Sequence, residues 1–391
     1  MNINLFDDHS ALSLRPLTFT RPVADLRIGI LTIAEKWEKY SSAAVGFCTS
    51  GYLAVKYKIR PDADTYINGS ICPDLHLFDA IAALQSGEVL SQDTIIIAYK
   101  VNPGELLSLA EGALLRPVHY SGTFTQIVFP EDIFKNNDVQ LRADFVLLTK
   151  GRVSAKLSAT NTVLGDQIFL EEGVEAECAT FNTLTGPVYL GKNSQVWEGS
   201  HIRGSFSLGE GSRVKMGSKI YGQTTVGPFS TVGGELNNAV IWGYSSKGHE
   251  GYLGNSVMGQ WCNIGADSNN SNLKNNYAEV KLWDYEQLSF RKTGLQFCGL
   301  IMADHVKCGI NTMFNTGTVA GVSANVFGSG YPRNFIPDFA WGGPQGFDVY
   351  ALEKMFATTE KVFERKNVEF NQIEKDILAS IFELTSIYRS F

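Results

Sequence analysis

The sequence predicts an α/β domain over residues 1–145, a parallel β-helix of hexapeptide repeats over 146–345, and a helical segment over 346–391. Three observations predict this order. Short apolar runs alternate with amphipathic helical spacing in the first part. An aliphatic residue recurs every six positions in the middle part, and apolar residues follow the i, i+3, i+4 rule at the end.

The first part contains both strand and helix patterns. The apolar runs NINLF (2–6) and TIIIAY (94–99) have the length of buried strands. The segments 26–40 and 74–86 place apolar residues at helical spacing and polar residues on the opposite face. We therefore expect an α/β sheet with helices packed on it.

The middle part is defined by eight successive aliphatic residues, each six positions after the last. About one residue in four is Leu, Ile or Val in a typical chain, so chance would give this series on the order of once in 10⁵. A period of six does not keep one face of an α-helix, whereas three hexads close one triangular coil of a β-helix. The eight inward-pointing residues are Leu190, Val196, Ile202, Leu208, Val214, Ile220, Val226 and Val232.

The period breaks between 233 and 299 and then returns. The break contains the Asn-rich stretch NIGADSNNSNLKNNY (263–277), which predicts a loop leaving the solenoid, and such loops often carry the functional site. At the end of the chain, apolar residues from Phe370 to Tyr388 predict a helix that packs on the solenoid or covers its end. The returning hexads are read as Leu300, Val306, Thr312, Thr318 and Ala324.

Composition excludes several classes of function. The chain has 391 residues and a net charge of -7, and no Lys/Arg cluster indicates a nucleic-acid partner. No apolar run is long enough to span a membrane, and the first residues do not form a signal peptide, so a cytoplasmic protein is expected. The six cysteines lie far apart without a CxxC pair, which predicts reduced thiols rather than a zinc site.

A histidine interrupts the periodic region. His249 lies between Gly248 and Gly251, and the segment HEGYLGNSVMGQWCNIGAD (249–267) resembles the acetyltransfer motif of the GlmU-like family. That motif has His, two residues, Tyr, one residue, Gly, and then Asn-Ile-Gly-Ala. The stretches LRPLTFTRPVADL and INTMFNTGTVAG are similar to the Bacteroidetes-type form of this family. The residues that match in order are His249, Tyr252, Gly254, Asn263, Ile264, Gly265 and Ala266.

The resemblance implies a bifunctional enzyme of sugar-nucleotide synthesis. A nucleotidyltransferase domain would transfer a nucleotide from an NTP to a sugar 1-phosphate with Mg²⁺. A left-handed β-helix would transfer acetyl from acetyl-CoA to an amino-sugar 1-phosphate, as in the synthesis of UDP-N-acetylglucosamine. The resemblance also implies a homotrimer with its acetyltransfer site between adjacent subunits.

Within the β-helix, the resemblance assigns His249 as the general base that removes a proton from the attacking amine. Tyr252, Asn263 and Asn272 would bind the sugar or orient this base. Lys215 stands where the family has a phosphate-binding arginine, although a lysine is a point charge rather than a bidentate fork. Asn237, two residues after Glu235, stands where the family has a second cation, and Lys247 is the candidate to replace it. His305 is the next candidate for the base.

The N-terminal part departs further from the family. Arg15, Thr18 and Arg21 are retained as candidate nucleotide-binding residues, but FDDHSALS (6–13) replaces the usual glycine-rich loop. The family's Asn-Gly-Asp corresponds to Asn68, Gly69 and Ser70, so the aspartate that holds magnesium is missing. Asp7, Asp8 or Asp74 are candidates to replace it, and the metal ligands stay undetermined.

Two other functions are compatible with the sequence. One is a sugar-1-phosphate nucleotidyltransferase, similar to glucose-1-phosphate thymidylyltransferase, whose β-helix serves only trimerisation or regulation. The other is a regulatory scaffold without catalysis. Binding of acetyl-CoA would distinguish the bifunctional enzyme from both of these alternatives. Release of pyrophosphate would distinguish the nucleotidyltransferase from the regulatory scaffold.

Overall fold

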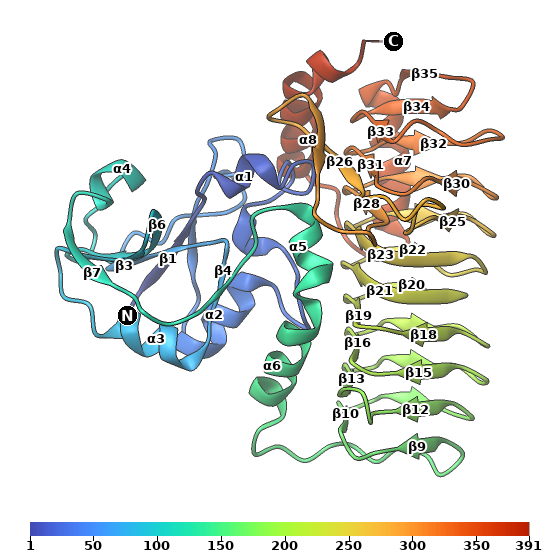
Figure 1. Ribbon diagram of the computed structural model, residues 1–391, viewed down its shortest axis with the longest axis horizontal. Helices are drawn as coiled ribbons and strands as arrows, with labels where there is room; N and C mark the ends of the chain where they lie inside the picture. Colours follow the sequence, from blue (N-terminus) through green and yellow to red (C-terminus); the bar gives the residue numbers. More distant parts are fainter. Residues whose placement is uncertain (391) are drawn as a thin grey trace. The chain divides into compact units, whose positions relative to one another are not determined.

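A computed structural model describes residues 1–390 (Figure 1). The chain divides into two compact units. The N-terminal unit comprises residues 1–26 and 31–129, and the second comprises residues 27–30 and the chain from Pro130 onward. This division falls earlier than the predicted boundary near 145, because α5 (Pro130–Lys135) and α6 (Asn137–Thr149) pack on strands of the second unit. No helix within residues 1–390 combines the length and apolar character that crossing a membrane requires.

The N-terminal unit is built on a mixed sheet in the order β2-β1-β3-β6-β5-β7. β1 pairs in parallel with β2 on one side and with β3 on the other. This reversal of strand order is a topological switch point, where open α/β sheets bind ligands beyond the carboxyl ends of the strands. The strands are β1 (Ile3–Phe6), β2 (Gly46–Cys48), β3 (Thr65–Asn68), β5 (Glu88–Gln92), β6 (Ile95–Lys100) and β7 (Arg116–His119). The predicted strands at 2–6 and 94–99 are β1 and β6.

The helix predicted over 26–40 begins only at Ile33. Thr32 is its N-cap: the Thr32 Oγ1 accepts from the Glu35 N–H at 3.1 Å, and the Glu35 carboxylate accepts from the Thr32 N–H at 2.6 Å. Gly29 has φ +74°, which ends any helical run before it. The helices and the small antiparallel pair of this unit are α1 (Ser10–Ser13), η1 (Val23–Asp25), α2 (Ile33–Ser41), α3 (Leu75–Ala82), α4 (Leu109–Gly112), β4 (Ile71–Cys72) and β8 (Thr125–Gln126).

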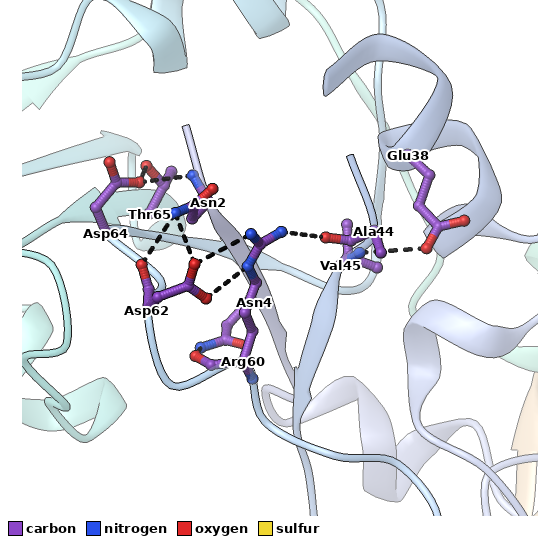
Figure 2. Close-up of polar contacts among 9 residues, drawn as sticks. All are labelled: Asn2, Asn4, Glu38, Ala44, Val45, Arg60, Asp62, Asp64 and Thr65. Carbon is purple, nitrogen blue, oxygen red and sulfur yellow. Dashed lines mark hydrogen bonds and ion pairs between the residues drawn. The ribbon is translucent and has the colours of Figure 1, made fainter. Parts of the chain in front are cut away.

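A polar network holds the start of this sheet together (Figure 2). The buried Asn4 side chain on β1 accepts from the Arg60 N–H at 2.8 Å and donates to the Arg60 carbonyl at 3.0 Å. The Arg60 guanidinium then donates to the Ala44 carbonyl at 2.8 Å and pairs with Asp62 at 2.7 Å. These contacts satisfy the polar groups of Asn4 inside the sheet and tie Arg60 to β1 and to Ala44, which precedes edge strand β2.

The second unit is a parallel β-solenoid whose coils stack from β9 to β34 (Figure 1). All eight predicted inward residues, from Leu190 to Val232, are at most 2% exposed and belong to one core cluster, so the hexad prediction is confirmed. Leu190 pairs with Leu208 and Leu208 with Val226, so inward residues of successive coils stack in a column. Each eighteen-residue coil contributes one residue to this column. The handedness stays a prediction.

Three faces make up each coil. The second face is a ten-stranded sheet that ends in an antiparallel strand. First-face strands are β10 (Ile168–Leu170), β13 (Val188–Leu190), β16 (Phe206–Leu208), β19 (Thr224–Val226), β28 (Leu300–Met302), β31 (Thr318–Ala320) and β33 (Phe335–Ile336). Second-face strands are β11 (Glu175–Ala176), β14 (Gln195–Val196), β17 (Arg213–Val214), β20 (Thr231–Val232), β22 (Ser246–Lys247), β24 (Asn263–Ile264), β29 (Lys307–Cys308), β32 (Asn325–Val326), β34 (Ala340–Gly343) and β35 (Gly346–Val349). Third-face strands are β9 (Thr162–Leu164), β12 (Thr180–Asn182), β15 (His201–Arg203), β18 (Lys219–Tyr221), β25 (Asn269–Asn270) and β30 (Met313–Phe314), and the long strands β21 (Glu235–Ile241) and β23 (Tyr252–Met258) run from the third face into the first.

The downstream hexads have a different register from the predicted one. Met302 pairs with Met258 and Ala320, so the column continues through Met302 rather than through Leu300. Leu300 and Thr318 form a second inward column two residues earlier, where the upstream coils carry the buried residues Val188, Phe206 and Thr224. Residues i and i+2 of a strand point to the same side, so both columns are buried and the sequence period alone does not distinguish them.

The predicted insertion is shorter than the Asn-rich stretch suggests. Residues 263–270 still form strands β24 and β25, and the chain leaves the coil only between Asn270 and Leu300. This segment carries the hairpin β26 (Lys281–Asp284) and β27 (Ser289–Lys292). Arg291 of the hairpin pairs with Glu131 of α5 at 2.7 Å, which fixes the hairpin on the second unit.

The C-terminal helices pack on the solenoid, as predicted for this part of the chain. One corner of the coils carries Phe229, Tyr244 and Trp261, all with φ near +60°, and their rings stack with centroids 5.1 and 4.2 Å apart. Phe363 of α7 continues the stack at 3.8 Å from Trp261. The helices are α7 (Leu352–Glu364), α8 (Gln372–Leu384) and η2 (Ser386–Tyr388).

Candidate functional site

His249 lies at an exposed corner between β22 and β23 of the solenoid. The corner, residues 248–251, depends on glycine. Gly251 has φ +112°, and a Cβ atom there would lie 2.1 Å from the Ser268 carbonyl oxygen. The coil below turns through Gly233 and Gly234 alone, and a Cβ on Gly234 would lie 2.7 Å from the His249 carbonyl oxygen. Main-chain packing thus fixes the place of this histidine while its side chain faces solvent.

Tyr252, Asn237 and Asn272 meet beside this corner. The Tyr252 hydroxyl accepts from the Asn272 amide at 2.9 Å and from the Asn237 amide at 3.4 Å. Asn272 also donates to the Asn255 side-chain carbonyl at 2.7 Å. The tyrosine ring lies along Gly254, where a Cβ atom would be 2.2 Å from the hydroxyl. The two accepted hydrogen bonds leave the Tyr252 hydroxyl proton free to donate to a bound molecule.

Glu235 lies next to this cluster on the same face. It pairs with Tyr252 in the register of β21 and β23, and its carboxylate accepts from the Tyr221 hydroxyl. That hydrogen bond, together with burial, raises the pKa of Tyr221 to about 12. Lys219 lies 3.8 Å from Glu250, the residue after His249. The face around His249 therefore combines a carboxylate, amides, phenols and one exposed ammonium.

Lys215 reaches the His249 corner from two coils below. Its Cδ atom lies 3.5 Å from the position a Cβ on Gly248 would take, and the residue is half-buried. Asn263 is exposed on the second face, where it pairs with Ser246 and Lys307. The structure thus brings Lys215, Glu235, Asn237, Tyr252 and Asn272 around the corner, and it places Asn263 on the adjoining face.

Lys247 does not extend toward solvent as a phosphate-binding cation would. It is 1% exposed, and its ammonium donates to the main-chain carbonyls of Gly233, His249 and Glu250. Burial lowers the pKa of Lys247 to about 8. In this conformation the three ammonium hydrogens of Lys247 are donated inside the solenoid. Lys247 therefore does not occupy the place in the substrate site that the sequence predicts for it.

The alternative base, His305, is covered. It is 6% exposed and its ring stacks on Phe363 of α7, with centroids 6.1 Å apart. A substrate could reach this imidazole only after α7 had moved. Of the two candidate histidines, only His249 faces solvent.

The N-terminal unit has a pocket of about 730 Å³ at its topological switch point. Phe6 and Asp7 from the end of β1 and Cys48 and Thr49 from the end of β2 line it, together with Tyr99 of β6. The Asp7 carboxylate accepts from the Val23 N–H at 2.9 Å and from the Thr49 hydroxyl. Burial raises the pKa of Asp7 to about 6 against the effect of these hydrogen bonds. Of this lining the sequence singles out only Asp7, because residues from two strands meet only through the parallel pairing.

The predicted nucleotide-binding residues have mixed placements. Arg15 is half-buried, and its guanidinium lies 4.9 Å from the centroid of the Phe19 ring. Thr18 donates to the Ala11 carbonyl at 2.7 Å, and buried Arg21 pairs with Asp25 at 3.2 Å. Both side chains are therefore engaged in contacts within residues 11–25.

Asn68 is the last residue of β3, and Gly69 follows it inside the same unit. The Asn68 amide donates to the Asp8 carboxylate at 2.7 Å, and its carbonyl accepts from the Ser70 N–H and hydroxyl. Gly69 lies close to the Phe6 carbonyl oxygen, 3.1 Å from where a Cβ would stand. Asn68 thus links the ends of β1 and β3 rather than facing a ligand in this structure.

Of the candidates for holding the Mg²⁺ that the resemblance implies, only Asp7 lines the pocket, whereas the other side chains are engaged within the fold. Ser70, in the place of the metal-binding aspartate, is 1% exposed and bonded to Asn68. Asp74 caps α3 by accepting from the Leu77 N–H at 2.8 Å, and Asp8 accepts from Ser10 and Asn68. Within residues 1–390, no three His, Cys, Asp or Glu side chains converge as metal ligands would.

Comparisons with known proteins find one matching family model and several similar solved structures. Residues 3–153 match the family model described as sugar nucleotidyl transferase, so the N-terminal part of the chain carries a domain of this kind. Among solved structures, the chain is similar to UDP-N-acetylglucosamine acyltransferase from Campylobacter jejuni at 12% identity and a TM-score of 0.34, covering 59% of this chain and 96% of that one. It is also similar to the Arabidopsis UDP-N-acetylglucosamine acyltransferase (16% identity, TM-score 0.22, 60% and 91% covered) and to a hexapeptide transferase family protein from Anaplasma phagocytophilum (17%, 0.19, 56% and 91%). No curated protein matches the chain.

Proposed function

We propose that the solenoid transfers an acetyl group from acetyl-CoA to the amino group of an amino-sugar 1-phosphate, with His249 as general base. The observation that carries the proposal is the His249 corner. One exposed imidazole is held by glycine packing beside the Tyr252, Asn237 and Asn272 cluster. The resemblance of residues 249–267 to the acetyltransfer motif supports the same reaction.

In this reaction the amine nitrogen attacks the thioester carbonyl while the neutral imidazole of His249 takes a proton from that nitrogen. The carbon–sulfur bond then breaks, and the imidazolium returns the proton to the leaving thiolate. The products are the N-acetyl sugar phosphate and CoA. The exposed position of His249 suits this role, because a base must reach the proton that it abstracts.

The polar groups near His249 suit a sugar phosphate. Lys215 supplies a cation near Gly248, and Lys219 supplies an exposed one beside Glu250. The Tyr252 hydroxyl and the Asn237 amide offer hydrogen bonds to sugar hydroxyl groups. The assembly we propose is a homotrimer, in which a neighbouring subunit would complete the acetyl-CoA site.

A second candidate function is nucleotidyl transfer from an NTP to a sugar 1-phosphate in the N-terminal unit. The family match of residues 3–153 and the pocket at the β1 switch point favour it. The pocket is lined by Phe6, Tyr99 and Asp7, which suits an aromatic base. Because the expected metal ligands are replaced, we derive no step through Mg²⁺.

The deciding experiment uses the full chain with acetyl-CoA and a panel of amino-sugar 1-phosphates, and it reads free thiol and product mass. We expect thiol release that depends on the acceptor. Release of pyrophosphate from UTP or dTTP with a sugar 1-phosphate, with and without MgCl₂, tests the second function in the same preparation. Absence of acetyl-CoA binding would refute the proposal and leave the solenoid as a scaffold.

A further inference from the structure

Lys247 occupies a position in an inward column whose other members from Val196 to Val326 are Val, Ile or Cys. It pairs with Val232 in the coil below. Ser246 pairs with Asn263 in the coil above, so Ile264 is the next residue of the same column. Lys247 is 1% exposed, and its chain belongs to the interior of the coil. A lysine inside an apolar column needs partners for its ammonium.

Those partners are three main-chain carbonyls of the two adjacent corners. The Lys247 Nζ donates to the oxygens of Gly233 at 3.0 Å, His249 at 2.5 Å and Glu250 at 3.3 Å. The lower corner has two residues and the upper one has four, so the two cannot pair residue by residue. Among residues 1–390, no main-chain N–H bonds to the carbonyl of Gly233 or of His249. The ammonium takes the place of the missing ladder donors.

We propose that Lys247 is a positioning residue for His249, whose ammonium fixes the 248–251 corner from inside the solenoid. The inference rests on the proposed role of His249 and adds the group that holds it in place. Both the carbonyl of His249 and that of the next residue are bound by the same nitrogen. The backbone that carries the imidazole is therefore tied to the core rather than to the surface.

A purely structural lysine would be a poor choice at this position. Burial lowers the pKa of Lys247, so its charged form is disfavoured in the fold, although Glu250, Asp267 and Cys308 face it and act in the opposite direction. An apolar side chain of similar length would fill the column without that cost. The charge is explained by its hydrogen bonds to the two corners, two to the 248–251 corner and one to Gly233.

The test compares Lys247→Met with Lys307→Met in the full chain. Lys307 is a matched control, because its ammonium donates to the His305 carbonyl at 3.2 Å on the same face of the solenoid. Hydrogen–deuterium exchange of peptides covering 244–255 is the first readout. We expect Lys247→Met to accelerate exchange of the 248–251 amides by about 10-fold or more while the Tm stays level or rises. Lys307→Met should leave these amides unchanged.

Kinetics provide the second readout. Lys247→Met should lower kcat for acetyl transfer by about 10–100-fold with little change in KM, because a small displacement of a base costs that much. Wild-type kcat should fall again above about pH 8, since the neutral amine has one hydrogen fewer for three carbonyls, and the variant should lack this falling limb.

The two proposals fail in different ways. Unchanged exchange at 248–251 in Lys247→Met would overturn the positioning role, whatever the activity. A falling limb that persists in the variant would do the same. Wild-type protein without acetyl transfer would overturn the proposed function alone, because the exchange measurement needs no substrate. A Lys247→Met chain that loses its Tm transition would show a core role and would also overturn the inference.

Discussion

Replacing His249 by alanine tests its proposed catalytic role separately from its effect on stability. Among residues 1–390, no hydrogen bond or ion pair to another residue is found for its imidazole, and the residue is exposed. Removing it should therefore change the free energy of unfolding by no more than about 0.5 kcal/mol. As a general base it should contribute about 10²–10⁴-fold to kcat, which is equivalent to about 3–5 kcal/mol of transition-state free energy. A loss of rate of this size with an unchanged Tm is the expected outcome.

The assay is initial-rate thiol release from acetyl-CoA with saturating amino-sugar 1-phosphate, measured from pH 5 to 9. The wild-type rate should rise with pH over the lower part of this range, because only the unprotonated form of a general base accepts a proton, and His249→Ala should lose this limb. His201→Ala is the matched control, because His201 is also exposed on the third face, on β15. Full acetyl transfer by His249→Ala would refute the reasoning and would assign the base to another group.

Three further predictions test the core, the N-terminal loop and a buried acid. Leu208→Ala should lower the free energy of unfolding in urea by about 3–5 kcal/mol, because Leu208 is fully buried between Leu190 and Val226. Ser207→Ala is the control and should be neutral or stabilising, since the buried Ser207 hydroxyl has no partner among residues 1–390. Equal losses of stability in the two variants would mean that the register is wrong. Arg15→Ala should weaken the binding of UTP or dTTP and reduce the salt dependence of that binding in calorimetry, whereas the control Lys39→Ala should do neither. Equal affinities of the wild-type chain and both variants would exclude Arg15 from the nucleotide site. Burial raises the pKa of Asp338 to about 6, so between about pH 4 and 6 this carboxyl is protonated in the folded chain and ionised in the unfolded chain. The free energy of unfolding should therefore fall by up to about 3 kcal/mol as the pH rises through this window. Asp338→Asn should flatten this pH dependence, and an unchanged slope would contradict the assignment.

The sequence predicts the solenoid well because its signal is repeated. Each aliphatic from Leu190 to Val232 meets the same environment one coil later, so one spacing predicts many contacts. The same spacing fails after the insertion, where Leu300 and Met302 both point inward and only strand pairing distinguishes the two columns. The helix predicted from residue 26 fails for a local reason, since Gly29 and the Thr32 cap delay the start to Ile33.

The candidate site is predicted in part. The motif around His249 selects residues that the fold brings to one corner, and Tyr252, Asn237 and Asn272 do meet there. Lys247 is different, because a lysine in a broken hexad is read as a surface residue. Its inward direction follows only from the pairing of β22 with β20. His305 is likewise a candidate base by residue type, and only the packing of Phe363 on its ring shows that its imidazole is covered.

A parallel solenoid satisfies its main chain by stacking each coil on an equal one, and this regularity limits where chemistry can occur. If the corner had the same length in every coil, its main-chain groups would hydrogen-bond residue by residue to those of the next coil. No main-chain carbonyl would then need a charged side chain inside the solenoid as its donor. The change from the two-residue corner at Gly233 and Gly234 to the four-residue corner at 248–251 breaks that match. The break exposes His249 on the outside and leaves carbonyls on the inside, and a single ammonium satisfies them. Insertion of two residues between Gly233 and Gly234 should therefore restore ladder pairing to the corner and make Lys247 dispensable for its order. Exchange at 248–251 that still accelerates in Lys247→Met with this insertion would show that the ammonium acts for another reason.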